Sequence, residues 1–104
     1  MKYVIDIDGV ICNEDVDVLE RSGYYERIKH INSLYDEGHT IVYFTARGMN
    51  SQNDNQANSD LKYRALTESQ LDTWGCKYHS LFFGKPNCDY YVDNKNMLME
   101  TFFN

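Results

Sequence analysis

Four short runs of apolar residues predict four β-strands. The runs cover residues 2–7, 40–45, 81–83 and 90–92, and they are rich in β-branched and aromatic side chains. Stretches with helical character separate most of them, and alternating strands and helices indicate a mostly parallel sheet with right-handed connections. Only about six residues join the last two runs, which is too short for the usual crossover helix.

Three helices are predicted between and after these strands. The first has apolar residues at helical spacing and a stop at Gly38; its apolar residues are Tyr24, Ile28, Ile31, Leu34 and Tyr35. The second is predicted over residues 61–75, with an apolar side made of Leu61, Ala65, Leu71 and Trp74. Thr67 and Gln70 form a possible capping box, so this helix could instead begin there. A final helix is predicted over residues 95–103.

Two polar segments interrupt this pattern. Residues 9–22 contain several acids among a few apolar residues, and we interpret them as a loop or flap with a solvated acidic surface. Residues 48–60 are rich in Asn, Gln and Ser and have little apolar content. This second segment is long for a connector in so small a chain, so it is either a floppy linker or a lid over a functional site.

Candidate chemistry begins directly after the first apolar run, at Asp6 and Asp8. Residues two apart in an extended segment point to the same side, so both carboxylates should emerge together at the carboxyl end of a strand. Ligands bind at that edge in open parallel sheets. Because two adjacent carboxylates repel, the pair usually needs a cation, a shared proton or a chemical task. Taken alone, the pair could equally be an acidic turn made by Gly9.

Three further features follow in order along the chain. Thr45 ends the second apolar run, Lys85 precedes the last run, and Asp93 follows it. Each has an ordinary structural explanation by itself: a turn residue, a solvated loop lysine and a helix cap. Their joint occurrence in this order favours a catalytic site.

The ordered set resembles the haloacid dehalogenase (HAD) superfamily of phosphotransferases. The resemblance runs from Asp6 to Lys95 and is strongest to the small phosphatases of capsule and polysaccharide biosynthesis, through the segments Thr45-Ala46-Arg47-Gly48 and Gly84-Lys85-Pro86. It implies a minimal Rossmann-like α/β fold without a cap domain, with about four mostly parallel strands in the order 3-2-1-4 flanked by helices.

The resemblance also implies a role for each residue of the set. Asp6 would be the nucleophile that forms an aspartyl phosphate, and Asp8 the acid and base. Mg²⁺ would be held by Asp6, Asp93 and the backbone carbonyl of Asp8. The substrate-binding residues would be Thr45, Ala46, Arg47 and Lys85, with Thr45 and Lys85 also acting in catalysis. Arg47 could equally pair with a surface acid.

One departure concerns the fourth motif. Many relatives carry two acids there, whereas this chain has Asp93 followed by Asn94. The amide keeps an oxygen but loses the charge, so metal affinity could be lower than in those relatives.

Composition limits the remaining function classes. The chain has 104 residues, which we expect to form one domain over residues 1–104. Its net charge of −6 argues against a nucleic-acid backbone or an anionic membrane as the main partner. Three widely spaced cysteines and no signal-peptide pattern favour reduced thiols in the cytoplasm.

The expected function is Mg²⁺-dependent hydrolysis of a phosphomonoester on a small phosphorylated metabolite, with a sugar phosphate as the favoured class. A homodimer is a possible assembly. Two alternatives stay open: a non-catalytic phosphate- or partner-binding module on the same scaffold, and a nucleic-acid end phosphatase. Retention of both Asp6 and Asp8 favours the enzyme, because binding alone does not need an acid beside a nucleophile.

Overall fold

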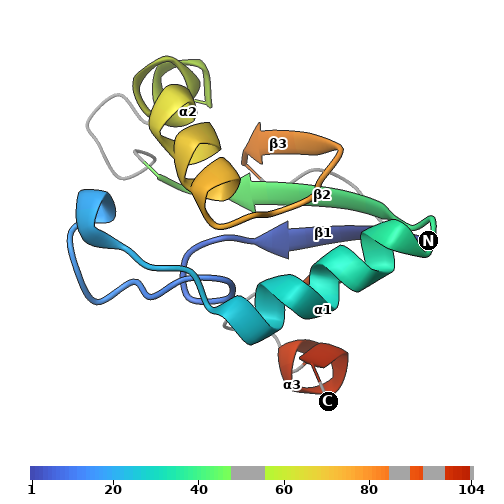
Figure 1. Ribbon diagram of the computed structural model, residues 1–104. Coiled ribbons are helices and arrows are strands. Elements are labelled where there is room, and N and C mark those ends of the chain that lie inside the picture. The colour runs from blue at the N-terminus through green and yellow to red at the C-terminus, as the bar shows by residue number, and fades with distance from the viewer. Residues whose placement is uncertain (48–55, 85–89, 93–97, 104) are drawn as a thin grey trace.

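The computed structural model describes residues 1–47, 56–84, 90–92 and 98–103. In chain order, the elements are the strand β1 (Lys2–Asp6), the 3-10 helix η1 (Val18–Glu20), the helix α1 (Tyr25–Asp36), the strand β2 (Thr40–Thr45), the helix α2 (Gln56–Thr73), the strands β3 (Ser80–Phe83) and β4 (Tyr90–Val92), and the helix α3 (Leu98–Phe103) (Figure 1).

The four strands form a parallel sheet in the order β3-β2-β1-β4. Both the strand order and the four predicted strands are therefore confirmed, and so is the α/β class. Asp6 pairs in register with Phe44, which puts the carboxyl ends of β1 and β2 at the same level of the sheet.

Both faces of the sheet carry buried apolar side chains. Val4, Val42 and Phe44 form a small cluster on one face. A larger cluster on the other face includes Ile5 and Tyr43 together with residues from α1 and α2, and partly buried side chains of α3 pack against it. This two-sided burial explains why β1 and β2 are continuous apolar runs.

The first predicted helix corresponds to α1. Ile28 and Ile31 are buried as expected, and Gly38 follows the helix with a φ of 97°, a conformation that glycine adopts without strain. The expectation for Tyr24 is wrong, because this residue precedes the helix and is 40% exposed.

The second predicted helix is α2, which begins earlier than expected. Residues 56–60, assigned from their composition to a polar loop, are helical. The alternative start at Thr67 is also wrong, because Thr67 lies inside α2 and is buried. Leu71 is buried, but Ala65 is exposed and does not contribute to an apolar side. Residues 48–55, where a lid was considered, lie outside the described residues.

The chain reverses sharply after β1. The backbone N–H groups of Val10 and Ile11 both donate to the carbonyl of Ile7, which makes a helical turn, and Gly9 has a φ of 85°. The chain then leaves the sheet and returns: the N–H of Asn13 donates to the carbonyl of Ser22. We call residues 13–22 the flap. Its acids Glu14, Asp15 and Asp17 are exposed, as expected.

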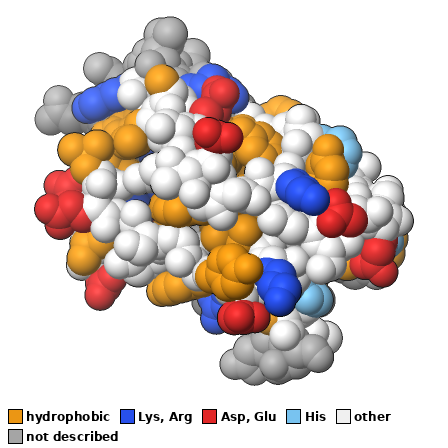
Figure 2. Space-filling model, in the orientation of Figure 1, with side chains coloured by type: hydrophobic (Ala, Val, Ile, Leu, Met, Phe, Trp, Pro, Cys, Tyr) orange, Lys and Arg blue, Asp and Glu red, His pale blue; other side chains and the backbone are white. Residues whose placement is uncertain are grey.

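None of the helices among the described residues has the length and apolar character needed to cross a membrane. On the face of the molecule in Figure 2, the described basic side chains are scattered among acidic and uncharged ones, with no continuous basic stripe.

Candidate active site

The described part of the candidate site is built around Asp8. Asp6 is the last residue of β1, Ile7 is buried, and Asp8 follows it at the edge of the sheet. Thr45 ends the neighbouring strand β2, and its hydroxyl donates a hydrogen bond of 3.2 Å to Oδ2 of Asp8. The parallel register thus brings Asp8 and Thr45 together, although they are 37 residues apart in the chain.

Arg47 binds the same carboxylate with two nitrogens. Its Nε lies 3.0 Å from Oδ2 of Asp8, and its Nη2 lies 2.8 Å from Oδ1. Its Nη1 donates to Thr67 and Gln70 of α2, at 3.0 and 2.7 Å. The Arg47 side chain is 3% exposed, so it is a buried arginine whose guanidinium is fixed from both sides.

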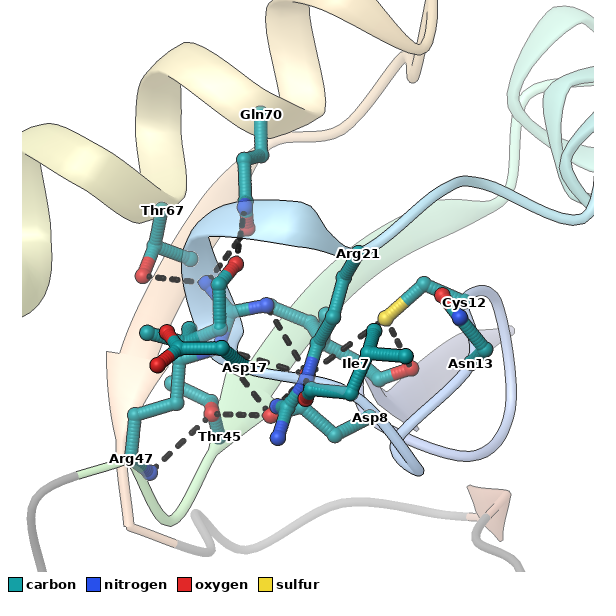
Figure 3. A network of polar contacts seen from close by, with 12 residues as sticks. Ile7, Asp8, Cys12, Asn13, Asp17, Arg21, Thr45, Arg47, Thr67 and Gln70 are labelled. Carbon is teal, nitrogen blue, oxygen red and sulfur yellow. Dashed lines mark hydrogen bonds and ion pairs between the residues drawn. The ribbon is translucent and has the colours of Figure 1, made fainter.

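Arg21 reaches Asp8 from the flap. Its Nη1 lies 2.7 Å from Oδ1 of Asp8, the oxygen that Nη2 of Arg47 also contacts. Figure 3 shows the two arginines converging on this carboxylate from different segments. Arg21 was not among the site residues predicted from the sequence. The available signal was that it is the only basic residue in the predicted flap of residues 9–22.

The flap is tied to α2 by Gln70. The side-chain nitrogen of Gln70 donates to the carbonyl of Val18 at 2.6 Å, while its side-chain oxygen accepts from Arg47. One amide therefore connects the flap, the helix and the buried arginine. The possible helix-capping role of Gln70 is replaced by this bridging role.

The two arginines set the charge state of Asp8. Burial of the carboxyl raises its pKa, but hydrogen bonding and charge from Arg47, followed by the same effects from Arg21, outweigh burial and hold the pKa below its ordinary value of 3.8. Asp8 is therefore a carboxylate at neutral pH in the free protein.

Cys12 contributes a weak hydrogen bond to the same group. Its Sγ lies 3.4 Å from Oδ1 of Asp8. Burial, with the nearby negative charge of Asp8, raises the pKa of the Cys12 thiol to about 12. A protonated thiol is a poor nucleophile, so Cys12 acts here as a donor to Asp8 rather than as a reactive cysteine.

The other predicted site residues are placed only in part. Ala46 follows Thr45 and is exposed. Lys85 and Asp93 lie outside the described residues. Val92, which directly precedes Asp93 in the chain, is in register with Ile5 of β1, next to Asp6.

Of the predicted metal ligands, the structure therefore describes Asp6 and Asp8 but not Asp93. Among the described residues, no group of three His, Cys, Asp or Glu side chains is close enough to hold a metal ion. The chemistry of the donors still fits Mg²⁺, since Asp6 and the backbone carbonyl of Asp8 are oxygen donors on one short segment. Both guanidinium groups engage the side chain of Asp8, which leaves its backbone carbonyl as the group suited to a metal.

A cavity of about 560 Å³ lies beside Gly9, the residue after Asp8. The described residues that line it are Gly9, Tyr24, Tyr25, Glu26, Arg27 and Met99. None of the residues that bind the Asp8 carboxylate lines this cavity, so the polar contacts rather than the cavity define the candidate site.

Comparison with solved structures supports the fold. The chain resembles a structural genomics target from Vibrio cholerae, with a TM-score of 0.80 and 23% identity, covering 99% of this chain and 88% of that one. It also resembles the D,D-heptose 1,7-bisphosphate phosphatase of B. bronchiseptica, a HAD-family enzyme solved with magnesium and phosphate. That match has a TM-score of 0.54 and 19% identity, and it covers 81% of this chain but only 50% of the enzyme. No family model matches the chain, and no curated protein matches it.

Proposed function

We propose that this protein is a Mg²⁺-dependent phosphomonoester hydrolase that acts through an aspartyl phosphate on Asp6. The observation that carries the proposal is the set of donors that surrounds Asp8 at the carboxyl edge of the sheet, namely Thr45, Arg47 and Arg21. The structural likeness to a phosphatase solved with magnesium and phosphate supports the same reaction class.

Each predicted site residue that is named below has a role in this reaction. Asp6 attacks phosphorus and forms a covalent phosphate, while the alcohol leaves. Asp8 transfers protons: it takes up a proton from solvent when substrate binds, gives it to the departing oxygen, and then takes a proton from the water that hydrolyses the aspartyl phosphate. Its low pKa in the free protein favours the accepting role. Thr45 stabilises negative charge on the phosphoryl group, and Arg47 stabilises the carboxylate of Asp8.

The metal and Lys85 complete the proposal. Asp6, Asp93 and the backbone carbonyl of Asp8 would hold Mg²⁺, which would offset the negative charge of the phosphoryl group. Lys85 would add a further positive charge beside the nucleophile. The proposed substrate is a small phosphorylated metabolite, with a sugar phosphate favoured because the enzyme of similar fold acts on a phosphorylated sugar.

A screen of phosphomonoesters tests the function directly. The purified protein should release phosphate from a subset of sugar phosphates with Mg²⁺ and lose that activity in excess chelator. Asp6→Asn should abolish turnover, whereas Asp36→Asn, which removes the same charge from an exposed residue, should leave it unchanged. Beryllium fluoride, which mimics a phosphoryl group on a carboxylate, should bind at Asp6 in the presence of Mg²⁺. Retained turnover in Asp6→Asn would rule out the nucleophile.

The second candidate is a non-catalytic phosphate-binding module. It is favoured by one observation: Asp8 already has two guanidinium partners, so its carboxylate is engaged in the free protein. This module would bind inorganic phosphate but hydrolyse none of the esters in the screen, and Asp6→Asn would leave its phosphate affinity intact.

A further inference from the structure

We infer that Arg21, carried by the flap, binds an anionic group on the leaving portion of the substrate. The inference rests on the proposed phosphatase function and deepens it. It assigns this enzyme to phosphomonoesters whose alcohol carries a second negative group, either a carboxylate or another phosphate.

Arg21 lies beside the place where the alcohol would leave. In the proposed reaction the transferred phosphoryl group lies at Asp6, and the departing oxygen lies at Asp8, which protonates it. Nη1 of Arg21 is 2.7 Å from Oδ1 of Asp8. A group that touches Asp8 from the flap is within reach of the alcohol that leaves, and it meets the same carboxylate oxygen as the arginine held by α2 (Figure 3).

The two arginines differ in how many of their N–H donors already have protein partners. Arg47 is held by Asp8, Thr67 and Gln70 through all three of its nitrogens, and its side chain is 3% exposed. Arg21 binds the carbonyl of Val16 through Nε and Asp8 through Nη1, and its side chain is 17% exposed. Among the described residues, Nη2 of Arg21 has no hydrogen-bond partner, so Arg21 has donors free for a ligand while Arg47 is committed.

Arg21 and Arg47 place two positive charges beside the Asp8 carboxylate. Two guanidinium groups meet one carboxylate oxygen, at 2.7 and 2.8 Å. A partly exposed arginine beside a second, buried arginine is suited to a carboxylate or phosphate, which can accept N–H bonds from its guanidinium. A neutral sugar hydroxyl would interact neither with the positive charge nor with two parallel N–H donors of the guanidinium.

The flap is built to hold Arg21 in this position. Asp17 accepts from the backbone N–H of Leu19 and so caps η1, and Arg21 directly follows the last residue of η1. Ser22, the next residue, pairs with Asn13 through backbone and side-chain bonds. Arg21 is thus fixed between a capped turn and the base of the flap, which lowers the entropy lost when it binds a ligand.

The test compares leaving groups. Wild-type protein is assayed with Mg²⁺ on glucose 6-phosphate, which has no second anion, on 6-phosphogluconate, which also carries a carboxylate, and on glucose 1,6-bisphosphate, which also carries a second phosphate. We expect kcat/KM to be higher for at least one of the two anionic esters. Arg21→Gln should lower the ratio of anionic to neutral kcat/KM by about 10- to 100-fold, mainly through KM.

Two further variants make the test decisive. Arg21→Lys keeps the charge but loses the fork, so it should retain part of the ratio. Lys29→Gln removes the same charge from an exposed residue of α1 and should leave the ratio unchanged. The preferred anionic ester in wild-type protein separates a carboxylate from a phosphate as the group that Arg21 binds.

Failure of the two proposals looks different. If wild-type protein hydrolyses none of the three esters nor any other in the screen, the phosphatase function falls. If it hydrolyses them but Arg21→Gln lowers every kcat/KM by the same factor, Arg21 only holds the flap, and the leaving-group inference is overturned.

Discussion

The guanidinium of Arg47 holds the carboxylate of Asp8 side on, with Nε 3.0 Å from one oxygen and Nη2 2.8 Å from the other. This geometry uses the planar fork of arginine, which a lysine cannot reproduce. Because the third nitrogen of Arg47 binds α2, the pair joins Asp8, just past the end of β1, to a helix far along the chain.

Removing Arg47 should therefore destabilise the fold as well as the site. We expect Arg47→Ala to lower the free energy of unfolding by about 2–4 kcal/mol, somewhat below the roughly 3–5 kcal/mol typical of broken buried pairs. The loss is smaller because Arg21 still faces Asp8, whose side chain is 16% exposed. Denaturant unfolding followed by the fluorescence of Trp74, the single tryptophan, measures it.

Two comparisons check this origin. Arg47→Lys should recover only part of the loss, and Lys77→Ala, which removes an exposed ion pair with Asp36, should cost less than about 1 kcal/mol. Equal effects of Arg47→Ala and Lys77→Ala would show that the Arg47 pair adds nothing beyond a surface contact.

The lowered pKa of Asp8 predicts how this pair responds to acid. A carboxyl whose pKa is lower in the folded state stabilises the fold above its unfolded pKa, here about 3.8, and loses that contribution as the pH falls through the folded value. Many other acids titrate in the same range, so the stability difference between wild type and Asp8→Asn isolates this one. That difference should be constant from about pH 7 to 5 and shrink below about pH 4. Parallel stability curves down to pH 3 would contradict the assignment.

The sequence predicted the centre of the sheet because β1 and β2 are buried on both faces. Val4 and Ile5, for example, belong to the two opposite clusters of the core, and such positions leave continuous apolar runs in the sequence. The place of Asp8 beside Thr45 was also predictable, because parallel strands end at one edge.

The rest of the site depends on contacts that leave no local pattern. Arg21 meets Asp8 only because the flap folds back, and Gln70 meets Val18 across 52 residues of chain. Thr67 and Gln70 match a helix-capping pattern, but both lie inside the longer α2, where they accept hydrogen bonds from Arg47. The early start of α2 was missed because residues 56–60 are mostly polar, and helical spacing of apolar residues is the signal that sequence reasoning uses.

A side chain at Gly23 should clash with the core, independently of the candidate active site. A Cβ added there would lie 2.8 Å from Cγ of Trp74 and 2.9 Å from Cδ1 of Ile28. Gly23→Ala should therefore lower the free energy of unfolding by about 1–3 kcal/mol through overpacking. Adding Ile28→Val removes the Cδ1 atom and should recover part of that loss, as measured by thermal unfolding.

Gly38 provides the matched control. Its φ is 97°, but a Cβ there would meet nothing within 4 Å, so Gly38→Ala adds backbone strain without a clash. Ile28→Val should give no recovery in that background. Recovery in both backgrounds, or in neither, would show that contact with Ile28 is not what excludes a side chain at Gly23.

Gln70 provides the sharpest test of how the flap is held. Gln70→Glu keeps an oxygen for Arg47 but cannot donate to the carbonyl of Val18, whereas Gln70→Ala loses both bonds. Since a single hydrogen bond contributes about 0.5–1.5 kcal/mol, both variants should speed hydrogen exchange at the Leu19 and Glu20 amides of η1 by about 2- to 10-fold.

Stability should separate the two variants. Gln70→Glu places a carboxylate beside Arg47 and should unfold no more readily than wild type, whereas Gln70→Ala leaves Nη1 of Arg47 with Thr67 alone and should be less stable. Ser69→Ala, at an exposed position of the same helix, should change neither measurement. If exchange at Leu19 and Glu20 were the same in all four proteins, the bond from Gln70 to Val18 would not be what holds the flap against α2.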